Sequence, residues 1–416
     1  MLQVAEQCLE ANQMSQPPED VFVRLAHSRA NLALMILTRL ADCSQLPKDI
    51  SSPLSKVAAA IFVLENPFAP EQISYFRTLL KILFAVLRGS RHSSKLTPTQ
   101  KDADSPVAVT QQVLTILDRV VARGFRALVT QVHDADSVTT PEDLALLTAV
   151  LQACCSVPGI DQCQVQILNI MLSHDVLQMA TSLYSWADKL SDRGDPIYGE
   201  LVMLFLLELS AIHSIAEQLA IDGFLGHIIR APLTGFMRRS TVSPLSDNAS
   251  ALRCYGIWAK GLLPLLLNVL CALGATIAPE VAYVLNQFPN LLQASVERFE
   301  PPNVSRVGAR DATHFLTLVA ATEMHSLALL VHVLAVLRVK HQREIPEVAW
   351  DAGLVHEYVD FWLASRKIMR ERLVALGPRE AAWRATPGGN GCESLLEEKV
   401  VGQLEAVRDM LGEVEE

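Results

Sequence analysis

The sequence predicts an all-α protein, a superhelical solenoid of degenerate HEAT/armadillo-like helical hairpins. Half of the 416 residues are hydrophobic, only 19% are charged and 6% are aromatic, a composition that favours helix and supplies a large core. Apolar residues recur at helical spacing along most of the chain. Prolines that open helices recur at spacings of roughly thirty-five residues, about the length of a helical-hairpin repeat, apart from a longer gap between Pro141 and Pro196. These prolines are Pro70, Pro106, Pro141, Pro196 and Pro232.

No residue-level repeat accompanies the prolines, so tetratricopeptide and ankyrin signatures are absent. HEAT or armadillo-like units need to keep only the apolar face of each hairpin, and the alternative is an irregular helical domain. We expect a single elongated domain over residues 1–416. Polar loops are expected at about 89–105, 233–248, 301–308 and 384–391. The abrupt start in an amphipathic helix predicts a fragment of a longer chain, with Met1 as an artificial first residue.

In the first half of the chain, short polar or proline-containing breaks separate the predicted helices. Thr140-Pro141-Glu142-Asp143 reads as a capping box, in which the first and last side chains satisfy free N–H groups at a helix start. The helix from Ile160 is expected to break near Ser173. The expected ranges are about 2–14, 17–41, 52–64, 70–87, 106–132, 140–157 and 160–190.

The stretch from Asp195 to Pro232 is the most apolar part of the chain. Asp195 and Pro196 suit a helix start, and residues 201–209 are apolar on nearly every face, so that helix must be buried on all sides. Two short helices should follow, at 213–220 and 224–230, because Asp222-Gly223 favours a left-handed helix end.

Further helices are predicted toward the C-terminus, with a kink at Pro264. The helix at 309–340 is expected to be the longest. The remaining expected ranges are 249–275, 279–288, 289–300, two helices within 350–376, and a last helix after the glycines at 388–391.

Two segments have the hydropathy of membrane spans, residues 261–279 and 317–337. The first contains Pro264 and Asn268, and the second contains Glu323, which is costly in lipid. Buried solenoid helices have the same hydropathy, so we expect no transmembrane segment.

The sequence predicts no enzyme, no metal site and no cofactor. It has no His-Glu-x-x-His, Gly-x-Ser-x-Gly or phosphate-loop motif. Cys154, Cys155 and Cys163 with His174 lack zinc-site spacing, and the eight scattered cysteines suit free thiols in a reducing compartment. The net charge of −10 argues against nucleic-acid binding.

An aromatic group near the C-terminus is the predicted partner-binding groove: Trp350, Tyr358, Phe361 and Trp362. The alternative is that these side chains pack the last repeats. A basic run at 366–372 follows them; a solvated helix face is the default, and a patch for an acidic partner the alternative.

The loop after Arg238-Arg239 contains the predicted phosphosites, Ser240, Thr241 and Ser243. A phosphate placed there would meet the two preceding arginines.

Three motifs carry a resemblance: residues 198–201 (YGEL), 205–210 (FLLELS) and 215–223 (IAEQLAIDG). They resemble the C-terminal part of the large inner-ring scaffold nucleoporin family of fungal type, named for its mass of one hundred and eighty-eight kilodaltons. The likeness is strongest over residues 194–236 and continues elsewhere by pattern alone. Because these motifs are apolar helix, they carry over no partner-binding residue.

The resemblance implies an α-solenoid, related to nuclear transport receptors, at the end of a much longer chain. It further implies a structural role in the inner ring of the nuclear pore complex, at the nuclear envelope. The implied partners are the inner-ring linker nucleoporin, with Phe-Gly repeats or transport receptors as further partners. The alternatives are a soluble transport-receptor-like adaptor that binds Phe-Gly repeats, an all-α enzyme and a membrane-associated helical domain.

Overall fold

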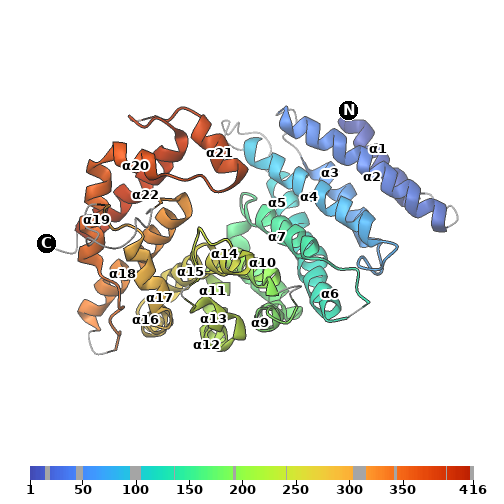
Figure 1. Cartoon of the computed structure of the whole chain (residues 1–416). Helices are drawn as coiled ribbons and strands as arrows, with labels where there is room; N and C mark the ends of the chain where they lie inside the picture. The colour runs from blue at the N-terminus through green and yellow to red at the C-terminus, as the bar shows by residue number, and fades with distance from the viewer. Residues whose placement is uncertain are drawn as a thin grey trace. The chain divides into compact units, whose positions relative to one another are not determined.

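The computed structural model describes residues 1–14, 19–43, 50–93, 105–134, 136–190, 194–239, 241–302, 315–341, 344–389 and 391–412. Helices dominate these ranges (Figure 1), and the one extended pairing among them is a parallel bridge between Leu316 and Leu373. The prediction of an all-α fold is therefore confirmed.

The helices divide into two compact units. Unit 1 comprises Met1–Tyr184 and Leu204–Ile215, and unit 2 comprises Ser185–Met203 and Ala216–Glu416. The division falls within three consecutive helices, near the end of α9 (Val176–Trp186) and inside α10 (Ile197–Ser210) and α11 (His213–Ile221). A single solenoid over the whole chain stays a prediction.

Unit 1 is a stack of helices in which each packs on its neighbours along the chain. The first helix contacts the second and third, the second contacts the fourth, and the fourth contacts α7, which is the pattern of stacked helical hairpins. Its main helices are α1 (Leu2–Met14), α2 (Glu19–Asp42), α3 (Ser51–Phe62), α4 (Ile73–Ser93), α5 (Ser105–Ile116), α6 (Arg123–Val132), α7 (Pro141–Cys155), α8 (Gln164–Ser173) and α9 (Val176–Trp186).

Two irregular turns join helices of unit 1. A π-helical turn, η1 (Leu117–Ala122), links α5 to α6 without a break, so the helix predicted at 106–132 is confirmed. A 3-10 turn, η2 (Ile160–Cys163), leads into α8 after Gly159, whose φ of 88° is left-handed and suits glycine.

The predicted capping box at the start of α7 is present. Asp143 accepts the main-chain N–H of Thr140 at 2.8 Å, and its buried carboxylate also receives Arg77 from α4, with Nε to Oδ1 at 2.6 Å. Asp143, which caps the start of α7, therefore also links α7 to α4.

Unit 2 surrounds two long apolar helical segments. Its helices after α11 are α12 (Phe224–Arg230), α13 (Pro232–Met237), α14 (Ala249–Gly256), α15 (Leu263–Leu273), α16 (Ala278–Asn286), α17 (Pro289–Glu297), α18 (Leu318–Lys340), α19 (Ala352–Ala364), α20 (Arg366–Arg372), α21 (Gly377–Ala385) and α22 (Leu395–Gly412). The π-helical η4 (Ile257–Leu262) joins α14 to α15, and the 3-10 turn η5 (Gly274–Thr276) follows α15. α18 packs on α15, α17 and α22.

The π-helical turn η4 lies directly before Pro264, where the sequence predicts a kink. Proline has no N–H to donate within a helix, and a local π-helical turn is one way in which a helix adjusts its hydrogen bonding. The Leu263 N–H reaches back five residues to the carbonyl of Trp258.

Glycines let the N-terminal half of α10 approach its neighbours in unit 2. A Cβ at Gly261 would overlap the side chain of Met203, and a Cβ at Gly199 would overlap Leu233. Met203 is fully buried, as the apolar pattern of this stretch predicts.

A buried carboxylate holds three helices of unit 2 together. Glu323 of α18 is inside the core and accepts hydrogen bonds from Trp258 Nε1 at 2.7 Å and from the Tyr255 hydroxyl. Arg298, which follows α17, donates through Nη2 to the same carboxylate at 2.7 Å. All three donors face one acidic group, so both carboxylate oxygens accept hydrogen bonds, whereas the buried Nε of Arg298 has no hydrogen-bond partner in the described part of the chain.

Three predicted boundaries are wrong. α4 continues to Ser93, past the expected loop start at 89. α13 occupies residues 232–237, where a loop was expected from 233, because Pro232 starts a helical turn whose Leu233 and Met237 are buried. α18 begins at Leu318, whereas the sequence predicts a start at residue 309. The side chain of Thr317 caps this helix start by accepting the N–H of Ala320. Residues 303–308 of the loop expected at 301–308 lie outside the described part of the chain.

Two continuous helical segments of the described chain, Ala249–Thr276 and Leu318–Lys340, are long and apolar enough to cross a membrane. The number of such candidate spans rises to four if each of two bent helix pairs is counted as one span. This test for membrane-spanning helices uses only helix length and amino-acid composition. Neighbouring helices bury 61% of the apolar window in the first and 56% in the second.

Candidate protein-binding sites

The predicted aromatic groove separates into buried and half-buried side chains. Trp350 and Trp362 are in the core, where their indole N–H groups donate to Ser295 Oγ at 3.0 Å and to the carbonyl of Phe299 at 2.7 Å. Those two tryptophans pack the last helices, the alternative stated above.

Tyr358 and Phe361 remain half-buried at the surface of α19, with the Phe361 ring packed edge-on to Trp362. A role in binding a partner stays a prediction for these two residues alone.

Two of the four basic residues on α20 form ion pairs within unit 2. Arg370 donates to Glu397 at 2.9 Å and to Glu393 at 2.6 Å, and Arg366 pairs with Glu405 at 3.2 Å. The hydrogen bond to Glu397 is the main cause that raises the pKa of Arg370. These arginines therefore join α20 to the segment containing α22 and are not free to bind an acidic partner.

The predicted phosphosites lie between α13 and α14. Thr241 is exposed, and Ser243 is half-buried with its hydroxyl accepting the N–H of Leu245 at 3.3 Å. Ser240 lies outside the described residues. Arg239 is exposed, and its guanidinium lies over the Phe236 ring at 4.3 Å. Phosphorylation of this segment stays a prediction.

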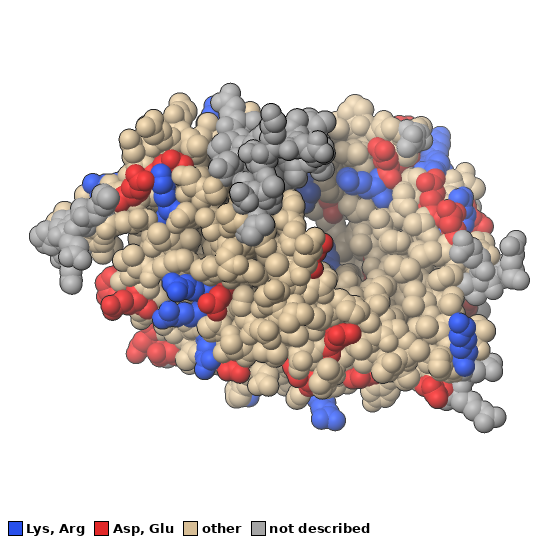
Figure 2. Space-filling view, turned by 180° about the vertical axis from the view of Figure 1, so that it is seen from behind, with Lys and Arg blue, Asp and Glu red and all other residues tan. Residues whose placement is uncertain are grey.

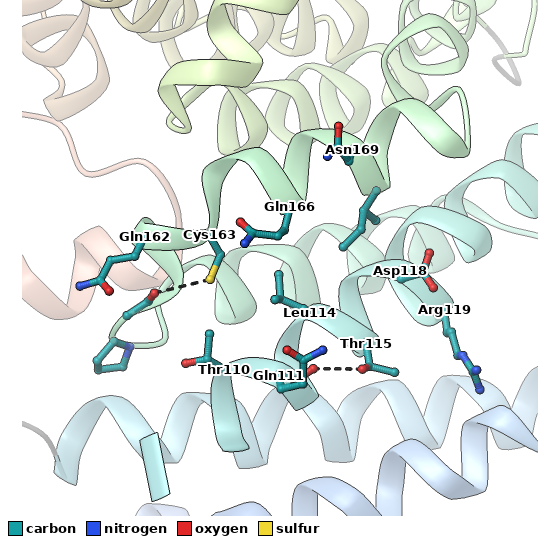
Figure 3. A pocket seen from close by; sticks show the side chains of 13 residues that line it. Thr110, Gln111, Leu114, Thr115, Asp118, Arg119, Gln162, Cys163, Gln166 and Asn169 are labelled. Atoms are coloured by element: carbon teal, nitrogen blue, oxygen red, sulfur yellow. Dashed lines mark hydrogen bonds between the residues drawn. The ribbon is translucent and has the colours of Figure 1, made fainter. Parts of the chain in front are cut away.

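The structure shows a groove in unit 1 that the sequence analysis missed. It has a volume of about 980 Å³ and lies between α5 with η1 on one side and η2 with α8 on the other (Figure 3). Four carboxamide side chains line it: Gln111, Gln162, Gln166 and Asn169. Gln166 and Asn169, three residues apart on α8, share one helix face, and this spacing is visible in the sequence; Gln162 precedes α8 in the 3-10 turn η2.

The groove has an apolar part and a charged end. Leu114 and Ile170 contribute apolar surface. At the charged end, Asp118 is hydrogen-bonded to His174 Nε2 at 2.8 Å, and the guanidinium of Arg119 lies over the Phe62 ring at 5.0 Å. Both charged residues that line the groove therefore already have an interaction within unit 1.

Metal-ligand geometry is not present in the described ranges, which contain no group of three or more His, Cys, Asp or Glu placed to hold an ion. Cys154 is fully buried, and burial raises the pKa of its thiol well above the ordinary value. A buried thiol of this kind packs as a small apolar side chain, as the sequence predicts.

Charged side chains are dispersed over the face shown in Figure 2. Lys and Arg alternate there with Asp and Glu, and no single basic patch dominates that view. A protein-binding surface of mixed charge suits this face better than one for phosphate backbones.

Comparison with known proteins identifies the family. The sequence model of the nuclear pore protein NUP188 C-terminal domain matches residues 54–411. The chain belongs to this family. The nucleoporin NUP188 of Chaetomium thermophilum is 56% identical over a match that covers 99% of this chain and 24% of that protein. Nucleoporin nup184 of Schizosaccharomyces pombe is 24% identical over 59% of this chain.

A solved structure agrees with the NUP188 assignment. A Nup188 fragment from Myceliophthora thermophila has 61% sequence identity and a TM-score of 0.78, covering 88% of this chain and 99% of that fragment. The resemblance stated from residues 194–236 is therefore confirmed. The chain spans about a quarter of the length of the Chaetomium relative, 24%.

Proposed function

We propose that the chain is a structural, non-enzymatic part of the nuclear pore complex at the nuclear envelope, where its helical surfaces bind other nucleoporins. The observation that carries this proposal is the NUP188 C-terminal domain match over residues 54–411. The matched relatives are named nucleoporins, which does not favour the transport-receptor-like adaptor.

The polar chemistry inside the stack supports binding over catalysis. Asp143 caps a helix and pairs with Arg77, and Glu323 accepts three hydrogen bonds from its neighbours. A carboxylate whose oxygens are all engaged holds helices in place and is not poised to move a proton. Stacked hairpins also present grooves and helix faces that are suited to partner segments.

The partner that we propose is the inner-ring linker nucleoporin, which the family resemblance implies. Affinity purification from fungal nuclear extract, with the 416-residue chain as bait and mass spectrometry as the readout, tests this. An unrelated helical-repeat protein on the same resin is the control. We expect enrichment of nucleoporins, and recovery of no pore component would contradict the proposal.

A second experiment separates the scaffold from the adaptor. Phe-Gly repeat peptides are immobilised and the chain is applied at physiological salt, beside a peptide in which each Phe is Ser. Absence of retention on both columns removes the adaptor alternative, whereas retention that depends on Phe favours it.

A further inference from the structure

We propose that Thr386 is a phosphorylation site for a proline-directed protein kinase, and that a phosphate there loosens the last turn of α21 from α22. Thr386 directly follows α21 and precedes Pro387. Six serines or threonines of the chain precede a proline: Ser52, Thr97, Ser105, Thr140, Ser243 and Thr386. Thr97 and the side chain of Ser105 lie outside the described part of the chain.

Exposure separates Thr386 from the other described positions of this kind. Pro53 and Pro244 are buried, so a kinase that selects its target by the following proline has no access to either ring. Thr140 is engaged as the cap of α7, and its hydroxyl oxygen also accepts Arg77 Nη2 at 3.1 Å. Among the positions whose side chains are described, Thr386 alone is exposed together with its proline.

The backbone around Thr386 is also suited to a kinase cleft. Residues 384–387 are all exposed. Thr386 has a φ of −90° and a ψ of 130°, the extended region that a residue before proline prefers. The hydroxyl and the proline ring are therefore accessible without the unfolding of a helix. Ser52 and Ser105, in contrast, lie in the first turns of α3 and α5.

The reaction transfers the γ-phosphoryl group of Mg²⁺-bound ATP to the Thr386 hydroxyl. Oγ1 forms the new bond to phosphorus while the bond from the γ-phosphorus to the β–γ bridging oxygen breaks, and ADP leaves. The hydroxyl proton passes to the catalytic base of the kinase.

Thr386 joins the end of α21 to the start of α22. Its hydroxyl donates to the carbonyl of Ala382 at 2.9 Å, and its own carbonyl accepts the N–H of Leu395 at 2.9 Å. Phosphorylation removes the hydroxyl proton, so the hydrogen bond to Ala382 is lost. It also places negative charge at the C-terminal end of a helix, where the helix dipole opposes it. Both effects act against the last turn of α21.

Surface contacts hold α21 in place, because none of its residues is buried. The half-buried Trp383 ring is flanked by two cations, the Arg379 guanidinium and the Lys399 ammonium of α22, each 4.7 Å from a ring centroid. A phosphate three residues after Trp383 attracts the same cations and competes with the ring for them. The contact between α21 and α22 is therefore sensitive to charge at Thr386.

The site is tested by phosphorylation of the 416-residue chain with ATP, Mg²⁺ and a purified proline-directed kinase. Tandem mass spectrometry locates the phosphate, and we expect more of it on Thr386 than on Ser52, Thr140 or Ser243. Thr386→Ala should abolish this phosphate, and Pro387→Ala should remove most of it while it keeps the acceptor. The matched control is Ser243→Ala, which should leave the Thr386 phosphate unchanged.

A synthetic peptide of residues 379–389 shows whether the kinase accepts the sequence apart from the fold. A chain that stays unmodified at Thr386 while this peptide is fully phosphorylated would overturn the proposed site. A peptide that the kinase does not accept would overturn it as well.

Hydrogen exchange measured by mass spectrometry, with phosphorylated and unmodified chains compared, tests the loosening of α21. Loss of one hydrogen bond and an unfavourable charge at the helix end together predict roughly tenfold faster exchange in α21. Thr386→Val removes the hydroxyl donor without adding charge, so it should show part of this effect. Exchange in α7 of unit 1 should not change and is the internal control. Unchanged or slower exchange in phosphorylated α21 would overturn the loosening.

Discussion

Replacement of Glu323 by alanine should strongly destabilise unit 2. The Glu323 carboxylate is buried and receives Trp258 Nε1, the Tyr255 hydroxyl and Arg298 Nη2. The Arg298 side chain is only 16% exposed, so it cannot recover full hydration when its partner is removed.

The size of the effect follows from the groups left behind. Removal of one partner from a buried ion pair costs about 3–5 kcal/mol, because an uncompensated charge remains. Each orphaned buried donor adds about 1–3 kcal/mol, and water that enters the vacated space offsets part of the total. We therefore expect Glu323→Ala to lower the free energy of unfolding by about 4 kcal/mol.

Tryptophan fluorescence during urea unfolding measures this loss in unit 2 alone. All five tryptophans of the chain, at positions 186, 258, 350, 362 and 383, belong to unit 2. Glu323→Gln keeps the shape and an acceptor oxygen but removes the charge, so an intermediate loss is expected.

The control for this experiment is Glu347→Ala. Glu347 is 76% exposed and pairs with Arg338 at 2.9 Å, so its removal should cost less than about 1 kcal/mol. If Glu323→Ala and Glu347→Ala shift the midpoint equally, the carboxylate network does not hold unit 2 together and the reasoning fails.

Three further changes probe packing, ionisation and modification. Gly261→Ala places a Cβ against the buried Met203 side chain and should cost about 1–3 kcal/mol in urea unfolding; a similar loss in a Met203→Ala background would contradict the close-approach argument. Burial raises the pKa of the Cys254 thiol to about 11 from its ordinary 9. The stability from this neutral thiol is complete below pH 9 and is lost as the pH rises toward 11, because the unfolded thiol ionises first; Cys254→Ala should flatten that part of the urea midpoint against pH. A kinase that prefers arginine before its target should phosphorylate the exposed Thr241 or an adjacent serine, and mass spectrometry should find less phosphate in Arg239→Ala; unmodified protein after full reaction would exclude this segment as a phosphosite.

Much of the fold was predictable because its signals are local. The Thr140–Asp143 capping box and the burial of Met203 depend on a few adjacent residues or on one helix period. Helix boundaries were predicted less well where burial overrides polar composition. The turn from Pro232 is helical because Leu233 and Met237 are buried in the core. The residues next to them in the sequence do not indicate this burial.

The sequence by itself determined the all-α class and the family, since helical periodicity and the motifs at 198–223 are carried by neighbours along the chain. Only the tertiary structure decided which side chains are available to partners. It placed Trp350 and Trp362 in the core through hydrogen bonds to residues 55 and 63 positions away. It also brought Gln111 and Gln166 to opposite walls of one groove. Such pairings depend on which helix faces meet, and helical spacing fixes the face of a residue without fixing the helix it will oppose.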